Sequence, residues 1–219
     1  SIAFGKKVDE FLGLNCVLVE AVTHKGERRG NTHKVVSWDK ACMDQSVFHE
    51  MIKKYGLPGP SWLHCTRELK TNPMTSYIRS IGWEAGTYDT AIGYRADEID
   101  RVPERYKERR LVFPLIDAGL KKADIYRIFA EEWPFTLEIE EHEGNCQACF
   151  KKNDRKLLTI MRDHPDRFEF AEKMEKYYDM VGPEFLKDPY APKRRWFRKY
   201  RSVSDLRRES KGNFEAYQD

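Results

Sequence analysis

Hydrophobic positions follow two different patterns along the chain, and the change from one to the other predicts both strands and helices. A nearly continuous apolar run at residues 15–22 is typical of a buried parallel strand, and a second strand is predicted at residues 87–93. A shorter strand is predicted at residues 111–114. Strands that alternate with helices favour an α/β fold, with a mostly parallel twisted sheet flanked by helices and a helical C-terminal part.

Apolar side chains at helical spacing predict the other regular elements. Helices are expected at residues 4–14, 45–55, 66–81, 121–133, 154–163 and 165–180, with loops at 24–33 and 138–149. Gly56 and Gly82 favour the ends of two of these helices, while Pro73 predicts an irregularity inside the third. We therefore expect an α/β domain over residues 1–150 and a basic helical extension over 151–219 that packs on it.

The charged residues change this picture mainly near the C-terminus. The formal net charge is only +3, which does not by itself indicate a polyanionic partner. Residues 193–211, however, hold nine basic and two acidic side chains, with Trp196, Phe197 and Tyr200 among them. This segment could bind the phosphates of tRNA or DNA and stack their bases. It could equally be a solvated terminal helix whose aromatic side chains dock on the domain.

The distribution of apolar residues also bears on location. No apolar run approaches the roughly 20 residues that a membrane-spanning helix needs. The first residues lack the basic-then-apolar order of a signal peptide. We expect a cytoplasmic protein with no membrane partner, and the sequence leaves open whether it forms a homo-oligomer.

Three of the five cysteines carry the candidate chemistry. An odd number of cysteines in a chain without a leader argues against a disulfide framework. Cys146 and Cys149 form a CxxC pair, which can turn two thiolates toward one metal ion or cluster. Cys65 directly follows His64, and basic residues adjoin all three cysteines. A single CxxC is a weak motif, so a reduced pair at a helix start is the alternative interpretation.

Four stretches in a fixed order then suggest a family. They are His64–Lys70 (HCTRELK), Ala91–Glu98 (AIGYRADE), Val112–Ile116 (VFPLI) with Lys122–Ile125 (KADI), and residues 144–152 (GNCQACFKK). Together they resemble the phosphoadenosine phosphosulfate (PAPS) reductase family of the adenine nucleotide alpha-hydrolase superfamily, and in particular its phage and bacterial branch. The resemblance implies that residues 1–150 bind an adenine nucleotide, ATP or PAPS.

The same resemblance implies an inorganic cofactor. Cluster-bearing members have a tandem cysteine pair followed at a similar distance by CxxC, and here Cys65 and Cys146 are 81 positions apart. His64 stands where the family has the first cysteine of the tandem. A 4Fe–4S cluster on Cys65, Cys146 and Cys149, with its last iron open or capped by His64, would assist sulfur transfer or sulfonucleotide reduction. The alternative is a non-catalytic nucleotide- or nucleic-acid-binding module, with a structural zinc held by the same four side chains.

The resemblance further assigns cationic residues to the nucleotide. Arg67, Lys70 and Arg95 match family positions that face phosphate or sulfate, and Gly93 would let the backbone pass close to the ligand. A surface ion pair, for instance between Arg95 and Glu98, is the alternative.

Two departures from the family limit this assignment. The pyrophosphate loop Ser-Gly-Gly-Lys-Asp-Ser is absent from the sequence and is expected to precede Ser1. No cysteine follows Cys149 to attack the sulfur of PAPS. No catalytic residue is therefore assigned.

Overall fold

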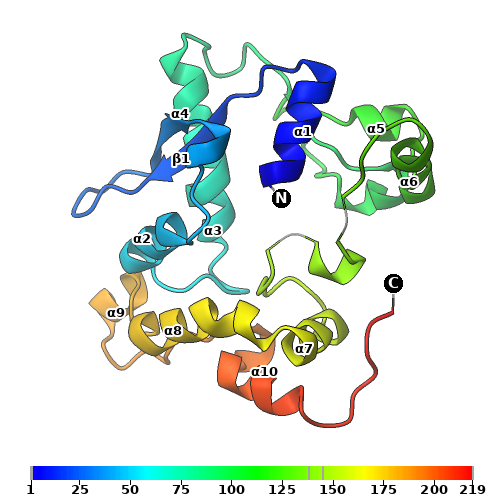
Figure 1. Ribbon diagram of the computed structural model, residues 1–219. Coiled ribbons are helices and arrows are strands. Elements are labelled where there is room, and N and C mark those ends of the chain that lie inside the picture. Colours follow the sequence, from blue (N-terminus) through cyan, green and yellow to red (C-terminus); the bar gives the residue numbers. More distant parts are fainter. Residues whose placement is uncertain (1, 138, 145, 219) are drawn as a thin grey trace. The chain divides into compact units, whose positions relative to one another are not determined.

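The computed structural model describes residues 2–137, 139–144 and 146–218, so Glu138 and Asn145 of the expected 138–149 loop lie outside the described residues (Figure 1). The chain is a mixed α/β protein whose contacts group into two compact units. Unit 1 takes residues 3–11 and 78–138, and unit 2 takes residues 12–77 and 139–219. None of the described helices is long and apolar enough to cross a membrane.

Unit 2 begins with a β-hairpin rather than with the expected parallel strand. Strand β1 (Leu18–Val22) pairs antiparallel with β2 (Thr32–Val36), with Leu18 opposite Val36. The prediction of a buried parallel strand at residues 15–22 was therefore wrong in direction, and β2 was not predicted at all. Only Ala21 of β1 is buried, and the hairpin has no neighbouring strand on either edge among the described residues.

Unit 2 has helices close to each of its expected positions, and two more, at residues 183–187 and 203–209, where no helix range was predicted. They are α2 (Ser46–Tyr55), α3 (His64–Thr66), the π-helix η2 (Arg67–Thr71), α4 (Asn72–Ser80, which runs into unit 1), α7 (Asp154–Asp163), α8 (Glu169–Tyr178), α9 (Pro183–Lys187) and α10 (Val203–Glu209). Short 3-10 turns are η1 (Trp38–Lys40), η4 (Glu141–Glu143), η5 (Pro165–Phe168) and η6 (Arg198–Tyr200). Gly56 ends α2 at a positive φ of 78°, which only glycine adopts without strain.

The irregularity predicted at Pro73 is a π-helical turn. The N–H of Asn72 bonds to the carbonyl of Arg67, five residues earlier. Proline has no N–H, so the helical ladder cannot continue regularly through residue 73. The extra residue of the π-turn accommodates this break between α3 and α4.

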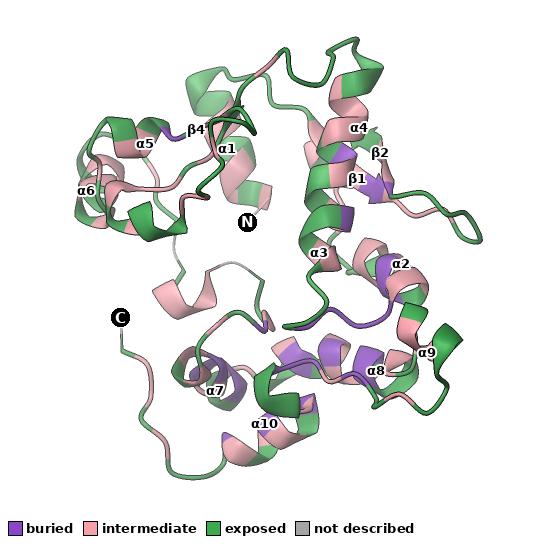
Figure 2. Cartoon of the chain, turned by 180° about the vertical axis from the view of Figure 1, so that it is seen from behind, coloured by how far each residue is buried: buried purple, intermediate pink, exposed green. Residues whose placement is uncertain are grey.

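The core of unit 2 joins segments that are far apart in the sequence (Figure 2). It consists of Met51, Ile52, Leu57, Phe150, Leu157, Ile160, Met161, Phe168, Ala171, Met174, Trp196, Phe197, Val203 and Leu206. Helix α2 therefore packs with α7, α8 and α10 in one apolar interior. For this reason the division of the chain does not coincide with the boundary expected at residue 150.

Unit 1 contains the parallel pair of the structure. Strand β3 (Thr90–Ala91) pairs with β4 (Leu111–Val112), and both are only two residues long. The other elements are α1 (Ile2–Leu12), η3 (Ala96–Arg101), α5 (Pro114–Asp117) and α6 (Lys122–Glu131). An extended parallel sheet, as expected from the sequence, is not present among the described residues. The fold prediction is thus confirmed only at the level of mixed α and β structure.

Aromatic rings supply much of the interior of unit 1. Phe4 and Phe11 on α1 contact Phe135, and Phe129 meets Trp133 with ring centroids 4.7 Å apart. Edge-to-face arrangements of this kind are the favoured geometry for aromatic pairs. Helix α1 is therefore held to α6 and the segment after it by ring contacts.

Candidate functional site

The CxxC pair lies on a turn that is anchored to the core of unit 2. The N–H of Cys149 donates to the carbonyl of Cys146 at 3.2 Å, which closes the turn. The indole Nε1 of Trp196 donates to the carbonyl of Ala148 at 2.7 Å, and Phe150, which directly follows the CxxC pair, is buried. Core packing and one indole hydrogen bond therefore fix the backbone that carries both thiols.

Lys152 ties the loop before this turn to the same place. Its half-buried ammonium donates to the carbonyl of His142 at 2.7 Å and also to the carbonyl of Gly144. Burial lowers the pKa of Lys152, and the neighbouring charges of Cys149 and Cys146 act in the opposite direction. A cation thus lies within electrostatic range of both thiols of the pair.

Cys65 belongs to the same neighbourhood. It is half-buried and packs against the core cluster, as Ala148 does. Burial is the main cause that raises the pKa of the Cys65 thiol, hydrogen bonds to Thr66 lower it, and the charges of Cys149 and Cys146 raise it further. The structure therefore brings all three predicted cysteines within electrostatic range of one another.

The donor chemistry suits a soft metal or an iron–sulfur cluster, because thiolates are the ligands that both prefer. The geometry agrees only in part. Across residues 2–137, 139–144 and 146–218, no three His, Cys, Asp or Glu side chains converge closely enough to hold a metal ion. The three thiols act electrostatically on one another, but they do not form a complete set of metal ligands.

His64, the expected fourth ligand, is held by the end of α2. Its Nε2 lies 3.0 Å from the carbonyl of Gly56, which can only accept, so this nitrogen carries the proton. Burial is the main cause that lowers the pKa of His64, and the ring is therefore held neutral with Nδ1 as an acceptor. A metal-binding histidine commonly donates its other N–H to a backbone carbonyl in this way.

Arg67 and Lys70 lie on the π-turn just after these residues. The Nε of Arg67 donates to Glu68 at 2.8 Å, while 61% of the arginine side chain is exposed. Glu68 itself is 2% exposed and binds several donors. Lys70 is exposed. The role of Glu68 was missed at the sequence level, although an acid beside an arginine inside an amphipathic helix is a usable signal.

Gly93 and Arg95 are in unit 1, where they follow strand β3. A Cβ at Gly93 would meet only Leu115 at ordinary contact distance, so the fold itself does not require glycine there. Arg95 binds both carboxylate oxygens of Asp97, at 3.1 and 3.2 Å, and lies 3.4 Å from Glu98. Asp97 also accepts the N–H of Lys122 at the start of α6. In the structure Arg95 therefore forms the ion pair that was the alternative to an oxyanion-binding role.

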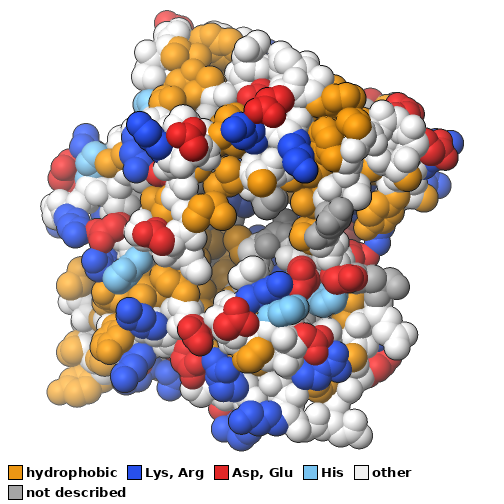
Figure 3. Space-filling view, in the orientation of Figure 1, with side chains coloured by type: hydrophobic (Ala, Val, Ile, Leu, Met, Phe, Trp, Pro, Cys, Tyr) orange, Lys and Arg blue, Asp and Glu red, His pale blue; other side chains and the backbone are white. Residues whose placement is uncertain are grey.

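The basic segment 193–211 is largely part of the folded body of unit 2. Trp196 and Phe197 are each 2% exposed and present no face to a base, whereas Tyr200 is 80% exposed. Most of its cations form ion pairs with acidic side chains of the same unit, as Lys193 does with Asp179. The space-filling view accordingly mixes basic and acidic side chains over the region of α7, α8 and α10 (Figure 3).

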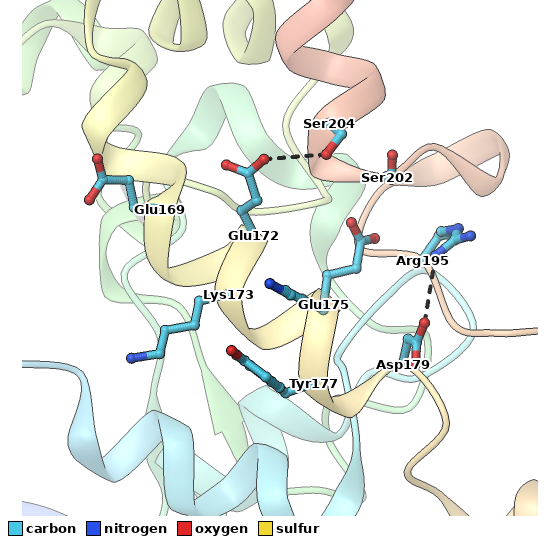
Figure 4. A pocket seen from close by; sticks show the side chains of 10 residues that line it. Glu169, Glu172, Lys173, Glu175, Tyr177, Asp179, Arg195, Ser202 and Ser204 are labelled. Carbon is cyan, nitrogen blue, oxygen red and sulfur yellow. Dashed lines mark hydrogen bonds and ion pairs between the residues drawn. The ribbon is translucent and has the colours of Figure 1, made fainter.

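A groove runs between helix α8 and this segment. It encloses about 660 Å³, and both acidic and basic side chains line it (Figure 4). Ser204 donates to Glu172 across it at 3.2 Å, and Arg195 lies 3.9 Å from Asp179. Glu175 at its base already accepts two backbone N–H groups. Charges of both signs line the groove, so it selects no one ligand charge.

Comparison with known proteins finds a phage relative. The chain is 38% identical over 117 residues to the uncharacterized nin region protein ORF290 of Escherichia phage lambda. The matched region takes 53% of this chain and spans only 38% of that protein's length. The sequence profile of no known family matches, and neither does any solved structure.

Proposed function

We propose that this chain is part of a cytoplasmic enzyme similar to PAPS reductases, which binds an adenine nucleotide and carries a 4Fe–4S cluster on Cys65, Cys146 and Cys149. The reaction would be sulfur transfer or sulfonucleotide reduction. The observation that carries the proposal is that Cys65 and the CxxC pair, which begins 81 positions later, act electrostatically on one another beside the half-buried ammonium of Lys152. The cytoplasm is proposed because thiols remain reduced there.

The chain's own residues would prepare this site. Trp196 and Phe150 hold the CxxC turn on the core, and Lys152 draws the preceding loop toward it. The ammonium of Lys152 would partly balance the negative charge of the thiolates. When bound, the cluster would supply an iron site for sulfur or for an electron.

The nucleotide part of the proposal uses the parallel pair β3–β4. We take this pair as the part of a parallel nucleotide-binding sheet that the described residues contain. Ligands of such sheets bind at the carboxyl ends of the strands. Gly93 follows β3 at that end.

The cofactor is tested by preparing the chain without oxygen and measuring iron and acid-labile sulfide. We expect brown protein, and loss of both elements in Cys65→Ser, Cys146→Ser and Cys149→Ser. Cys42→Ser is the matched control, because Cys42 is half-buried like Cys65 but bonds to Asp44 and Ser46 instead. Wild-type protein without iron, or iron loss in Cys42→Ser as well, contradicts the cluster.

Nucleotide binding is tested at Gly93. A methyl group there meets no close neighbour, so Gly93→Ala should keep the melting temperature of the wild type. If the nucleotide passes close to this backbone, the same variant should bind ATP and PAPS more weakly in calorimetry. Binding that is equal to the wild type removes Gly93 from the site.

A zinc-bearing binding module is the second candidate function, and the state of His64 favours it. The Nε2–H bond to Gly56 leaves Nδ1 as the free lone pair that a zinc ion needs. Colourless protein with one zinc per chain, and loss of that zinc in His64→Ala, would support this candidate over the cluster. In that case ATP and PAPS should not be consumed.

A further inference from the structure

Arg67 presents an unused guanidinium fork at the surface of unit 2. Its Nε is occupied by Glu68 at 2.8 Å, but among the described residues no group bonds to its two terminal nitrogens. The side chain is 61% exposed, so these nitrogens are accessible. Two parallel N–H groups in a plane match two oxygens of a phosphate or sulfate group.

The buried carboxylate of Glu68 holds this arginine in place through its Nε. Glu68 is 2% exposed, and its Oε2 accepts the N–H of Asn31 at 2.9 Å and the amide of Asn72 at 3.1 Å. Burial raises the pKa of Glu68, but the donors from Asn31 and Arg67 outweigh burial and leave the pKa below its ordinary value. The carboxylate is therefore charged and immobilised before any ligand binds.

The local backbone supports this arrangement. Arg67 opens the π-turn η2, and the side chains of Glu68 and Asn72 bond to each other across it. π-turns within helices occur frequently at functional sites. The side chain of Asn31 also donates to the carbonyl of Glu68 at 3.1 Å, so the loop before β2 is tied to the same turn.

We propose that Glu68 is a positioning residue that aims the fork of Arg67 at a phosphate or sulfate oxyanion bound on unit 2. This goes beyond the proposed function, because it adds an oxyanion subsite that is built by residues of unit 2 alone. An arginine already held by Nε loses less side-chain freedom when it binds than a free one. Lys70, one of the other expected cations, has no comparable anchor among the described residues.

The test is calorimetric titration of the chain with AMP, inorganic sulfate and adenosine. Arg67→Gln should weaken binding of AMP and sulfate by about 10- to 100-fold, the value of hydrogen bonds to a charged group. Arg67→Lys should weaken both less, because a lysine keeps the charge without the fork. Adenosine, which has no oxyanion, should bind all forms equally.

Arg162 offers a matched control. Its Nε also bonds to the neighbouring acid, Asp163, at 2.6 Å, but its Nη2 is used by the same carboxylate at 2.9 Å. Arg162→Gln makes the same charge change without removing a free fork. It should bind AMP and sulfate as the wild type does.

The role of Glu68 is tested by a double-mutant cycle. Glu68→Gln should weaken sulfate binding in the wild-type background and have no further effect in the Arg67→Gln background, because it acts through Arg67. If Glu68→Gln does not fold, Asn72→Ala removes one donor from the carboxylate and should weaken sulfate binding to a smaller extent. If the effects of Glu68→Gln and Arg67→Gln on sulfate binding are additive, Glu68 does not act through Arg67 and the positioning role is overturned. If Glu68→Gln does not fold, the role is overturned when Asn72→Ala binds sulfate as tightly as the wild type.

The outcomes separate the two proposals. If the wild type does not bind AMP but still binds sulfate through Arg67, the proposed nucleotide binding is wrong and the proposed role of the Arg67 guanidinium stands. Binding of AMP and sulfate that Arg67→Gln does not change, or no binding of either by the wild type, overturns the inference.

Discussion

Arg194 illustrates how a residue in a run of charges becomes part of the interior. Its side chain is 3% exposed, pairs with Glu184 and donates to the carbonyls of Tyr55 and Leu57 at 2.7 and 3.1 Å. A Cβ at Gly56 would collide with it. The sequence pattern could not reveal this, because neighbouring cations in the same run remain half-exposed.

We expect Arg194→Met to destabilise the protein by about 3–5 kcal/mol, because it breaks a buried ion pair and leaves two carbonyls without a donor. Urea unfolding followed by circular dichroism measures this change. Arg195→Met is the control, since Arg195 is 36% exposed and pairs only at 3.9 Å; its effect should stay within about 0.5 kcal/mol. Equal effects of the two substitutions contradict the structural role of Arg194.

Glu175 gives a prediction about pH. Burial raises the pKa of Glu175 above 4.5, although the N–H groups of Trp196 and Val203 act against this. The folded state therefore holds the proton more tightly than the unfolded state. Its contribution to stability is complete below about pH 4.5 and is lost as the pH rises through the raised pKa.

Glu175→Gln resembles the protonated acid and should flatten this pH dependence. Urea midpoints measured over a pH series from mildly acidic to neutral solution would show the wild type losing stability faster than the variant. Parallel curves would mean that Glu175 titrates as an ordinary exposed acid.

The spacing of the cysteines along the sequence is the only part of the candidate site that could be predicted from sequence. The Cys65–Cys146 separation and the CxxC pair pointed to cysteines whose charges act on one another, although they do not converge as metal ligands among the described residues. Their anchors could not be predicted. The hydrogen bond from Trp196 to Ala148, and that from Asn31 to Glu68, depend on tertiary contacts that leave no local pattern.

At the scale of elements, helices were predictable and strand partners were not. Helix α2 has apolar residues at helical spacing and a glycine at its end, so local chemistry decides it. The direction of β1 depends on which strand lies beside it. Its partner β2 carries His33 and Lys34 in place of a clean alternation and therefore gave no strand signal.

Helix α10 begins with a reciprocal cap. The hydroxyl of Ser202 accepts the N–H of Asp205 at 3.0 Å, and the carboxylate of Asp205 accepts the N–H of Ser202. The Ser202 hydroxyl also donates to the Asp205 carboxylate at 2.7 Å, and this bond, followed by that from the Ser202 N–H, lowers the pKa of Asp205 to about 2. The stabilisation from Asp205 is present above the unfolded pKa of 3.8 and is lost as the pH falls toward 2.

Ser202→Ala should cost about 1 kcal/mol of stability and should raise the pKa of Asp205 toward its ordinary value. Urea unfolding and NMR titration of the Asp205 carboxyl measure the two effects. Ser204→Ala lies on the same helix and removes only the 3.2 Å bond to Glu172. A Ser204→Ala variant as unstable as Ser202→Ala would argue against the cap.

For the whole molecule, the segment near the C-terminus closes the core of unit 2. A chain that ends after residue 192 lacks Trp196, Phe197, Val203 and Leu206, all of which are buried. Each large core side chain is worth about 2–5 kcal/mol, more in sum than a typical domain's stability. We expect this truncated chain to lose cooperative unfolding and dispersed NMR signals.

A chain that ends after residue 212 is the matched comparison. It loses the contacts of Tyr217 with Thr159 and Glu141 but keeps every core residue. Its stability should fall by about 1–4 kcal/mol, the cost of these two hydrogen bonds and of the bond from Arg155 to the carbonyl of Ala216, while it stays folded. A folded 192-residue chain would show that the C-terminal segment is dispensable.

The distance along the chain between α2 and α10 also has a consequence for biosynthesis. Met51 and Ile52 emerge from the ribosome long before Phe197 and Leu206, which cover the same apolar interior. Until those late residues are translated, helix α2 has no complete apolar surface against which its own apolar face can be buried. Nascent chains stalled at intermediate lengths should therefore recruit chaperones and should become free of them only once residue 206 has left the exit tunnel.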